Sequence, residues 1–112
     1  MPRPPTPYLG EFEYAVLLAV LKLGDEAYAV PVRSLLEARL LRPVARGALY
    51  TALERLEAKG ALRSRMGEPL EERGGRPRRF FTVTPAGLRA IRATHAALSR
   101  LTEGLETIVG HP

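Results

Sequence analysis

The sequence has 112 residues, of which 46% are hydrophobic and 26% are charged, and it contains no cysteine. This length allows one domain with a modest core, and the composition is that of a globular protein and not of a disordered one. The lack of cysteine excludes disulfide bonds and thiolate metal sites. No apolar run is long enough to span a membrane and the N-terminus lacks the apolar core of a signal peptide, so we expect a cytoplasmic protein.

The formal net charge is +5, and most of the excess lies in one segment. Residues 59–79 contain seven Lys and Arg side chains against three Glu, an excess of four positive charges. A basic patch of this kind on a small domain is typical of a protein that binds a polyanion.

The chain begins with a proline-rich stretch, residues 1–8, which predicts an extended, disordered arm. Apolar residues then recur at spacings of three and four between Leu9 and Leu23, which predicts a helix. Further apolar residues nearly surround that helix, so we expect a second subunit to cover part of it.

Two more helices are predicted close together, over Ala29 to Leu40 and over Ala45 to Lys59. Their short connection forces them to cross steeply, which is helix-turn-helix geometry. The later helix buries a stripe of Leu and Ala, and Gly60 ends it. Its opposite face carries no large aliphatic residue and is free to meet a partner.

After Gly60 the apolar period changes from helical to alternating. Residues 62–66 and 79–83 alternate as strands do, with Leu62, Ser64 and Met66 expected on the inner side, and the Gly- and Pro-containing stretch between them predicts a loop. A helix-turn-helix followed by such a hairpin is a winged helix. Phe80 and Phe81 are expected to pack in the hairpin and the core.

Thr84 and Pro85 form a helix start, with Thr as the N-cap and Pro in the first turn. The apolar residues that follow keep the spacing of a heptad seam over three heptads, so we expect one helix over residues 84–109 that pairs with its own copy. The predicted fold class is therefore mainly α with a small β-hairpin, a winged helix-turn-helix over residues 9–83 plus a long C-terminal dimerisation helix.

Three stretches resemble the PadR family of bacterial winged-helix transcription regulators: Gly47 to Glu57, Lys59 to Leu62, and Gly74 to Leu88. The resemblance covers about residues 9–105 and fits the short class with a single C-terminal helix. It implies a homodimeric DNA-binding repressor. The chain departs from the family pattern at Ala29, where Gly is usual, at Pro31 inside the second helix, and at Ala45, which replaces a common Ser cap.

In such a regulator the helix 45–59 would enter the major groove and the wing, residues 67–78, would lie on the backbone or in the minor groove of a pseudo-palindromic operator. Arg46 is the best candidate for a contact with a base edge or a phosphate. Tyr50 is a candidate for a phosphate contact, and Thr51 for a contact with a thymine methyl group or a phosphate. For each, the alternative is an ordinary solvated or packed side chain. The candidate DNA contacts are Arg46, Tyr50, Thr51, Arg55, Arg73, Arg76, Arg78 and Arg79.

The candidate dimer contacts come from the first and last helices: Phe12, Val16, Leu88, Ile91, His95, Leu98, Thr102 and Leu105. His95 is expected to be a hydrogen-bonded interface residue, with a pH or effector switch as the alternative. In the resembled family an apolar or aromatic effector can bind near the dimer interface, and Tyr8, Phe12, Tyr14 and His95 are the residues that would line such a site here.

No phosphate loop, nucleophile elbow, dinucleotide fingerprint or metal-ligand cluster occurs in the sequence, so we expect neither an enzyme nor a cofactor or metal. Two hypotheses remain. The chain is a dimeric DNA-binding regulator, or it is a winged-helix protein–protein interaction module whose basic wing is incidental. Salt separates them, because phosphate contacts weaken with ionic strength and apolar contacts tolerate it.

Overall fold

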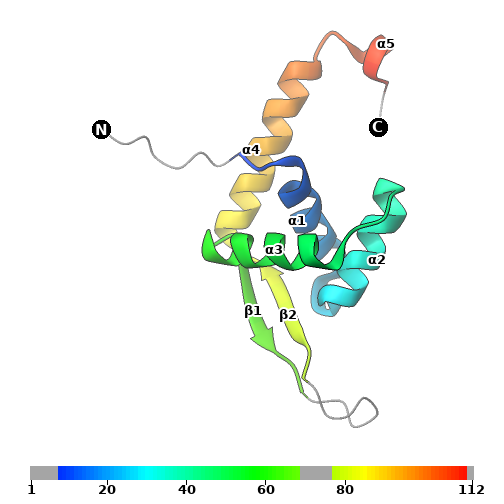
Figure 1. Ribbon diagram of the computed structural model, residues 1–112. Coiled ribbons are helices and arrows are strands. Elements are labelled where there is room, and N and C mark those ends of the chain that lie inside the picture. The colour runs from blue at the N-terminus through cyan, green and yellow to red at the C-terminus, as the bar shows by residue number, and fades with distance from the viewer. Residues whose placement is uncertain (1–7, 69–76, 111–112) are drawn as a thin grey trace.

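The computed structural model describes residues 8–68 and 77–110 (Figure 1). The predicted N-terminal arm, apart from Tyr8, and most of the predicted wing loop lie outside these residues. The elements are α1 (Glu11–Leu23), a 3-10 turn η1 (Gly24–Glu26), α2 (Ala29–Leu40), α3 (Arg46–Ala58), β1 (Leu62–Met66), β2 (Arg79–Val83), α4 (Pro85–Thr102) and α5 (Glu106–Val109).

Helix α1 lies at the centre and contacts α2, α3, α4 and β2. Its residues Val16 and Leu17 are wholly buried, together with Leu53 and Leu56 of α3. The chain itself therefore covers most of this apolar helix. The prediction that Val16 lies in a dimer interface is wrong, because its side chain has no surface left to offer a partner.

The turn between α2 and α3 is held by side chains of α2. Arg33 donates from Nε to the carbonyl oxygen of Val44 over 2.8 Å, and the amide of Val44 donates to Glu37 Oε2 over 2.9 Å. Val44 is itself buried in the core. These bonds fix α3 relative to α2, and the helix-turn-helix predicted from the sequence is confirmed.

Helix α2 ends at Leu40, and the next residue, Leu41, has a left-handed φ of 57° and a side chain that is 87% exposed. This conformation costs a residue with a Cβ about 1–2 kcal/mol, whereas glycine adopts it freely but is more flexible in the unfolded chain. We therefore expect Leu41→Gly to raise the free energy of unfolding by about 0.5–1 kcal/mol. The measurement is urea unfolding at one protein concentration.

Leu41→Ala is the matched control, because it removes the exposed side chain and keeps the strained backbone. If the alanine variant gains as much stability as the glycine variant, the gain comes from the side chain and the strain argument fails.

The strands β1 and β2 pair antiparallel with Leu62 opposite Val83 and Met66 opposite Arg79, which confirms the predicted hairpin. The hairpin is anchored at its base, where Phe81 is buried and its amide donates to the carbonyl oxygen of Ala27 over 2.8 Å. Met66 was expected to face inward but is 59% exposed. It lies at the end of the hairpin that extends away from the helices, where no described element covers it (Figure 1).

Helix α4 begins as predicted, since Thr84 Oγ1 accepts a hydrogen bond from the Gly87 amide and Pro85 is in the first turn. Its packed side carries Gly87, Ala90 and Thr94. The prediction of one helix over residues 84–109 is wrong, because α4 ends at Thr102 and Gly104 adopts a φ of 86°. The heptad spacing of apolar residues continues in the sequence across this break, but residues 103–105 are not helical.

The architecture is mainly helical with one antiparallel hairpin, so the predicted fold class of a winged helix is confirmed. No helix in the described ranges is long and apolar enough to cross a membrane.

Candidate nucleic-acid interface

The packing of α3 fixes which of its side chains reach the surface. Leu49, Leu53 and Leu56 are buried, and the opposite face is exposed. That face carries Arg46, Gly47, Tyr50, Thr51, Glu54, Arg55 and Ala58. Arg46 and Arg55 form no ion pair with any residue in the described part of the chain. The first two turns of α3 thus present a cation, a phenol and a hydroxyl to solvent from a rigidly held helix.

A groove of about 260 Å³ lies between α2 and α3, next to this face. It brings Arg46 and Tyr50 together with Arg33 of α2. The remaining lining residues are Ala29, Val30, Ser34, Glu37 and Leu49. Sequence reasoning missed Arg33, because its position on α2 becomes relevant only when the two helices cross.

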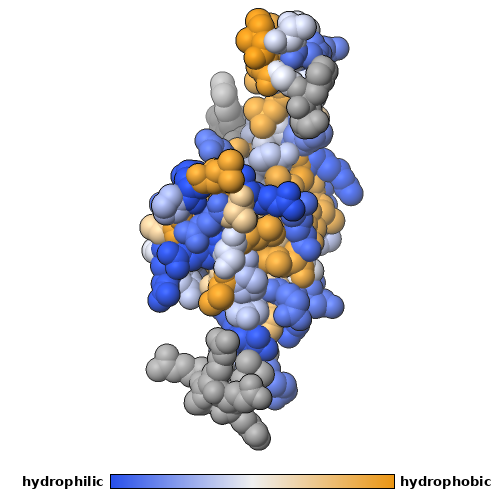
Figure 2. Space-filling model, turned by 90° about the vertical axis from the view of Figure 1, so that its right-hand side faces the viewer, coloured by the Kyte–Doolittle hydropathy of each residue, from blue (hydrophilic) through white to orange (hydrophobic). Residues whose placement is uncertain are grey.

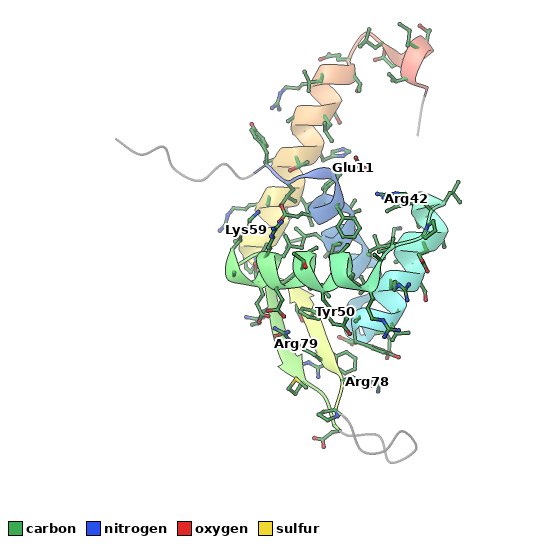
Figure 3. The ribbon with its side chains drawn as sticks, viewed as in Figure 1. Glu11, Arg42, Tyr50, Lys59, Arg78 and Arg79 are labelled. Carbon is green, nitrogen blue, oxygen red and sulfur yellow. The ribbon has the colours of Figure 1, made fainter. Side chains whose placement is uncertain are left out.

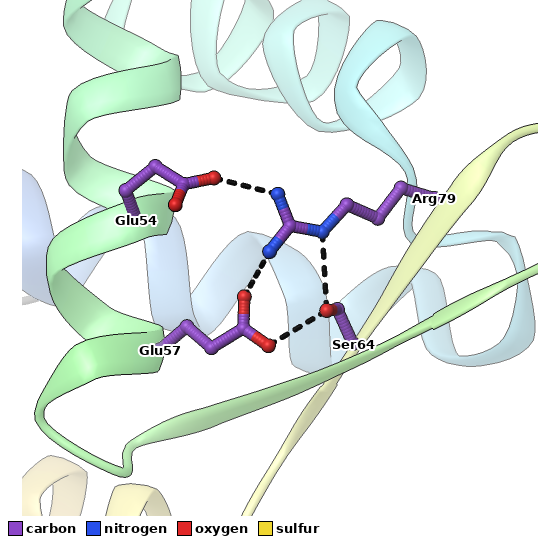
Figure 4. A network of polar contacts seen from close by, with 4 residues as sticks. All are labelled: Glu54, Glu57, Ser64 and Arg79. Atoms are coloured by element: carbon purple, nitrogen blue, oxygen red, sulfur yellow. Dashed lines mark hydrogen bonds and ion pairs between the residues drawn. The ribbon is translucent and has the colours of Figure 1, made fainter.

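Arg79 does not point freely into solvent but joins the hairpin to α3 (Figure 4). Its Nη1 lies 2.6 Å from Glu54 Oε1, its Nη2 pairs with Glu57, and its Nε donates to Ser64 Oγ over 3.1 Å. Ser64 Oγ in turn donates to Glu57 over 2.7 Å. The hydrogen bond with Glu54 and the charges of both carboxylates raise the pKa of Arg79, against a smaller lowering by burial. We call these four residues the Arg79 network.

Arg78 lies beside aromatic rings at the start of β2. Its guanidinium carbon is 4.7 Å from the ring centroid of Tyr28 and 5.3 Å from that of Phe80. Arg65 lies 4.8 Å from the Phe80 centroid, and the Tyr28 and Phe80 rings meet edge to face at 5.4 Å. The predicted packing roles of Phe80 and Phe81 are confirmed. The rings hold these cations against the hairpin through cation–π contacts.

The structure therefore separates the eight candidate DNA contacts into three sets. Arg46, Tyr50, Thr51 and Arg55 share the exposed side of α3. Arg78 and Arg79 are engaged within the chain, and Figure 3 shows them with Tyr50 on the hairpin side of α3. Arg73 and Arg76 lie outside the described residues. Arg63 and Arg65 on β1 are exposed and add positive charge to the hairpin.

The candidate dimer residues also divide by burial. Phe12, Leu88 and Ile91 are half-buried in the monomer, whereas His95, Leu98, Thr102 and Leu105 are exposed.

Of the effector candidates, Tyr8 and Tyr14 line a cavity of about 470 Å³ between the start of α1 and α4. Thr94, Ala97 and Leu98 are among its other lining residues. Phe12 packs against the core, and His95 is outside this lining.

Within residues 8–68 and 77–110, no three His, Asp or Glu side chains are grouped as a metal site would require. The groups brought together near α3 are cations, a phenol and a hydroxyl on an exposed helix face beside a projecting hairpin, and the one carboxylate on that face, Glu54, is paired with Arg79. Such groups bind phosphates and base edges.

The sequence profile described as the transcriptional regulator PadR-like family matches residues 17–93. A PadR-like transcription factor from Bacteroides fragilis has a similar structure, with 26% identity, coverage of 88% of this chain and 89% of that chain, and a TM-score of 0.66. A PadR family transcriptional regulator from Eggerthella lenta shows 28% identity over 87% of this chain and 82% of that chain, with a TM-score of 0.64.

The fold also resembles that of Bordetella bronchiseptica BpsR, whose DNA binding is regulated by 6-hydroxynicotinic acid. That likeness has 19% identity, covers 96% of this chain and 72% of that chain, and has a TM-score of 0.66. No curated protein matches the sequence.

Proposed function

The chain belongs to the PadR-like family of transcriptional regulators, and from this premise we propose that it is a homodimeric repressor that reads a pseudo-palindromic operator. Members of the family are DNA-binding transcription regulators and not enzymes. In the proposed complex α3 enters the major groove and the hairpin lies on the adjacent backbone or in the minor groove. Repression is the direction that the family resemblance implies.

The observation that carries this proposal is the exposed side of α3. Arg46, Tyr50 and Thr51 emerge there from a helix whose other side is locked into the core and whose entry turn is pinned to α2. A major groove admits one α-helix, and its base edges are read by side chains of these types. In the proposed complex Arg33 in the neighbouring groove, whose Nε is already bonded to Val44, would add its positive charge beside the phosphate backbone.

The homodimer is supported by apolar surface that the monomer leaves uncovered. On α4 and just beyond it, Leu98 is 50% exposed, Leu101 73% and Leu105 43%. A two-fold axis through this surface would repeat α3 on the other side of the dimer, and half-sites about one helical turn apart would then be read together.

An aromatic effector is the subordinate part of the proposal. The cavity lined by Tyr8, Tyr14 and Leu98 adjoins the apolar surface of α4, so a ligand bound there would contact the proposed interface. BpsR, which has the same fold, responds to an aromatic acid.

Binding to the DNA upstream of the chain's own coding region tests the proposal. We expect tight binding that resists a shuffled competitor duplex and weakens as salt rises, by a log–log slope of about −0.9 for each phosphate neutralised. Arg46→Ala should weaken specific binding about tenfold, the cost of one base-edge or phosphate contact. The measurement is a mobility-shift titration at two salt concentrations.

Arg100→Ala is the control, because it removes the same charge from an exposed side chain in the last turn of α4. That end of α4 points away from α3 (Figure 1). If the two variants lose the same DNA affinity, Arg46 contributes only its positive charge and makes no specific contact with the operator. Binding that is absent even at low salt would instead favour the protein–protein interaction module.

A further inference from the structure

The short helix α5 is an apolar segment without a place to pack. Every residue from 101 to 110 is exposed, and Ile108 and Val109 have 80% and 56% of their surface in contact with solvent. Leu105, Ile108 and Val109 lie at helical spacings of three and four, so they share one side. A single turn of helix is not stable in water by itself, so its apolar side calls for a binding partner.

A groove that matches this segment lies between α1 and α2. It has a volume of about 200 Å³, the size of a few aliphatic side chains, and its walls are almost entirely aliphatic. Its lining residues are Ala15, Leu18, Ala19, Lys22, Leu35, Leu36, Arg39 and Leu40. Viewed from the α2 side, Figure 2 shows hydrophobic side chains gathered in the middle of the molecule and others at the upper end, where α5 lies.

The charges of the two surfaces are opposite. Both ionisable residues that line the groove are cations, Lys22 and Arg39. Two anions lie beside the apolar residues of α5: Glu106 is its first residue, and Glu103 directly follows α4. Docking would therefore bury the aliphatic side chains and place carboxylates beside cations, an arrangement that favours the correct partner and register.

The segment does not fill the groove of its own chain. In the monomer α5 is exposed, the aliphatic rim of the groove at Leu18 and Leu35 is half-buried, and α4, about 27 Å long, carries α5 away from the groove (Figure 1). We propose that α5 of one copy docks in the α1–α2 groove of a second copy. The contact is then made twice in a two-fold dimer. This inference rests on the homodimer of the proposed function and adds a second contact to the one proposed at the apolar surface of α4.

Cysteine pairing tests the contact directly, because the full chain has no native cysteine. One variant carries Leu18→Cys in the groove and a second carries Ile108→Cys on α5. The two are mixed in equal amounts and oxidised mildly. We expect a disulfide-linked dimer on a non-reducing gel, at least tenfold more abundant than in the control mixture of Ile108→Cys with Ser34→Cys. Ser34 is exposed on α2 and does not line the α1–α2 groove.

Charge reversal gives a second, non-covalent measurement. Lys22→Glu and Glu103→Lys should each raise the dimer dissociation constant about fivefold, and combining them in one chain should restore most of the loss. Analytical ultracentrifugation measures the constants. Thermal unfolding checks that the variants fold, which we expect because both side chains are exposed.

Three results would overturn the inference. A dimer that binds DNA but cross-links no better in the test mixture than in the control mixture would leave the homodimer intact and reject only this docking. A fast-migrating cross-linked monomer in the Leu18→Cys/Ile108→Cys double variant would place α5 in its own groove. A chain that stays monomeric at all concentrations would reject the homodimer and the docking together.

Discussion

Arg79→Ala is expected to weaken operator binding about thirtyfold, more than the loss of the exposed Arg46. In the folded chain Arg79 compensates the charges of Glu54 and Glu57 on the helix proposed to enter the major groove. Its removal uncovers two carboxylates beside the phosphates and releases the hairpin from α3. The network is partly exposed, so solvent screening limits the cost to about 2 kcal/mol, which corresponds to about thirtyfold in affinity.

The companion variant separates this role from a direct DNA contact. Glu54→Gln and Glu57→Gln, added to Arg79→Ala, remove the uncovered charges and should recover most of the affinity. The measurement is the same mobility-shift titration, with thermal unfolding to show that each variant is folded. If affinity does not recover, Arg79 leaves its network and contacts phosphate directly, as the sequence alone suggested.

Gly87→Ala should lower the free energy of unfolding by about 2–3 kcal/mol and the melting temperature by about 10 °C. A Cβ on Gly87 would overlap the carbonyl oxygen of Ala61 and lie 2.8 Å from Val83 Cγ1. The Ala61 carbonyl group cannot move away from the added Cβ easily, because its oxygen accepts a hydrogen bond from the Thr84 amide over 3.0 Å. Shifting α4 instead would strain the Thr84 cap. The measurement is thermal and urea unfolding.

Gly47→Ala is the matched control, since Gly47 is also helical but a Cβ there meets nothing within 4 Å. Helix propensity alone predicts a gain of up to about 1 kcal/mol for both substitutions. Opposite signs at the two positions would show that the contact between α4 and Ala61 decides the outcome. A stabilised Gly87→Ala protein would show that the two segments can separate at little cost.

Local signals in the sequence predicted much of the fold. The apolar period gave α2 with its observed bounds, the change to alternation gave both strands, and Thr84 with Pro85 gave the start of α4. These features depend on residues within a few positions of each other, so one sequence contains them. The break after Thr102 coincides with Gly104, whose φ is 86°, whereas the heptad spacing that continues past it predicted one uninterrupted helix.

The part of the candidate site on the exposed side of α3 was also predictable, because it follows from the local sequence pattern of that helix. Once the buried stripe of α3 is known, Arg46, Tyr50, Thr51 and Arg55 must face outward. Their contacts with DNA stay a prediction. What no periodicity could indicate was which cations the chain would use internally, because Arg79 is 25 residues from Glu54 and 22 from Glu57.

The sequence by itself thus determined α2, the hairpin, the start of α4 and the outward side of α3, since each follows from a pattern no longer than a few neighbouring segments. The family resemblance came from motifs in three separate stretches between residues 47 and 88. Tertiary structure decided that Val16 is core and not interface, that Arg33 joins Arg46 in one groove, and that Arg79 joins the hairpin to α3. The physical reason is that burial and ion pairing depend on how elements cross in space, and the crossing is set by packing of the whole core.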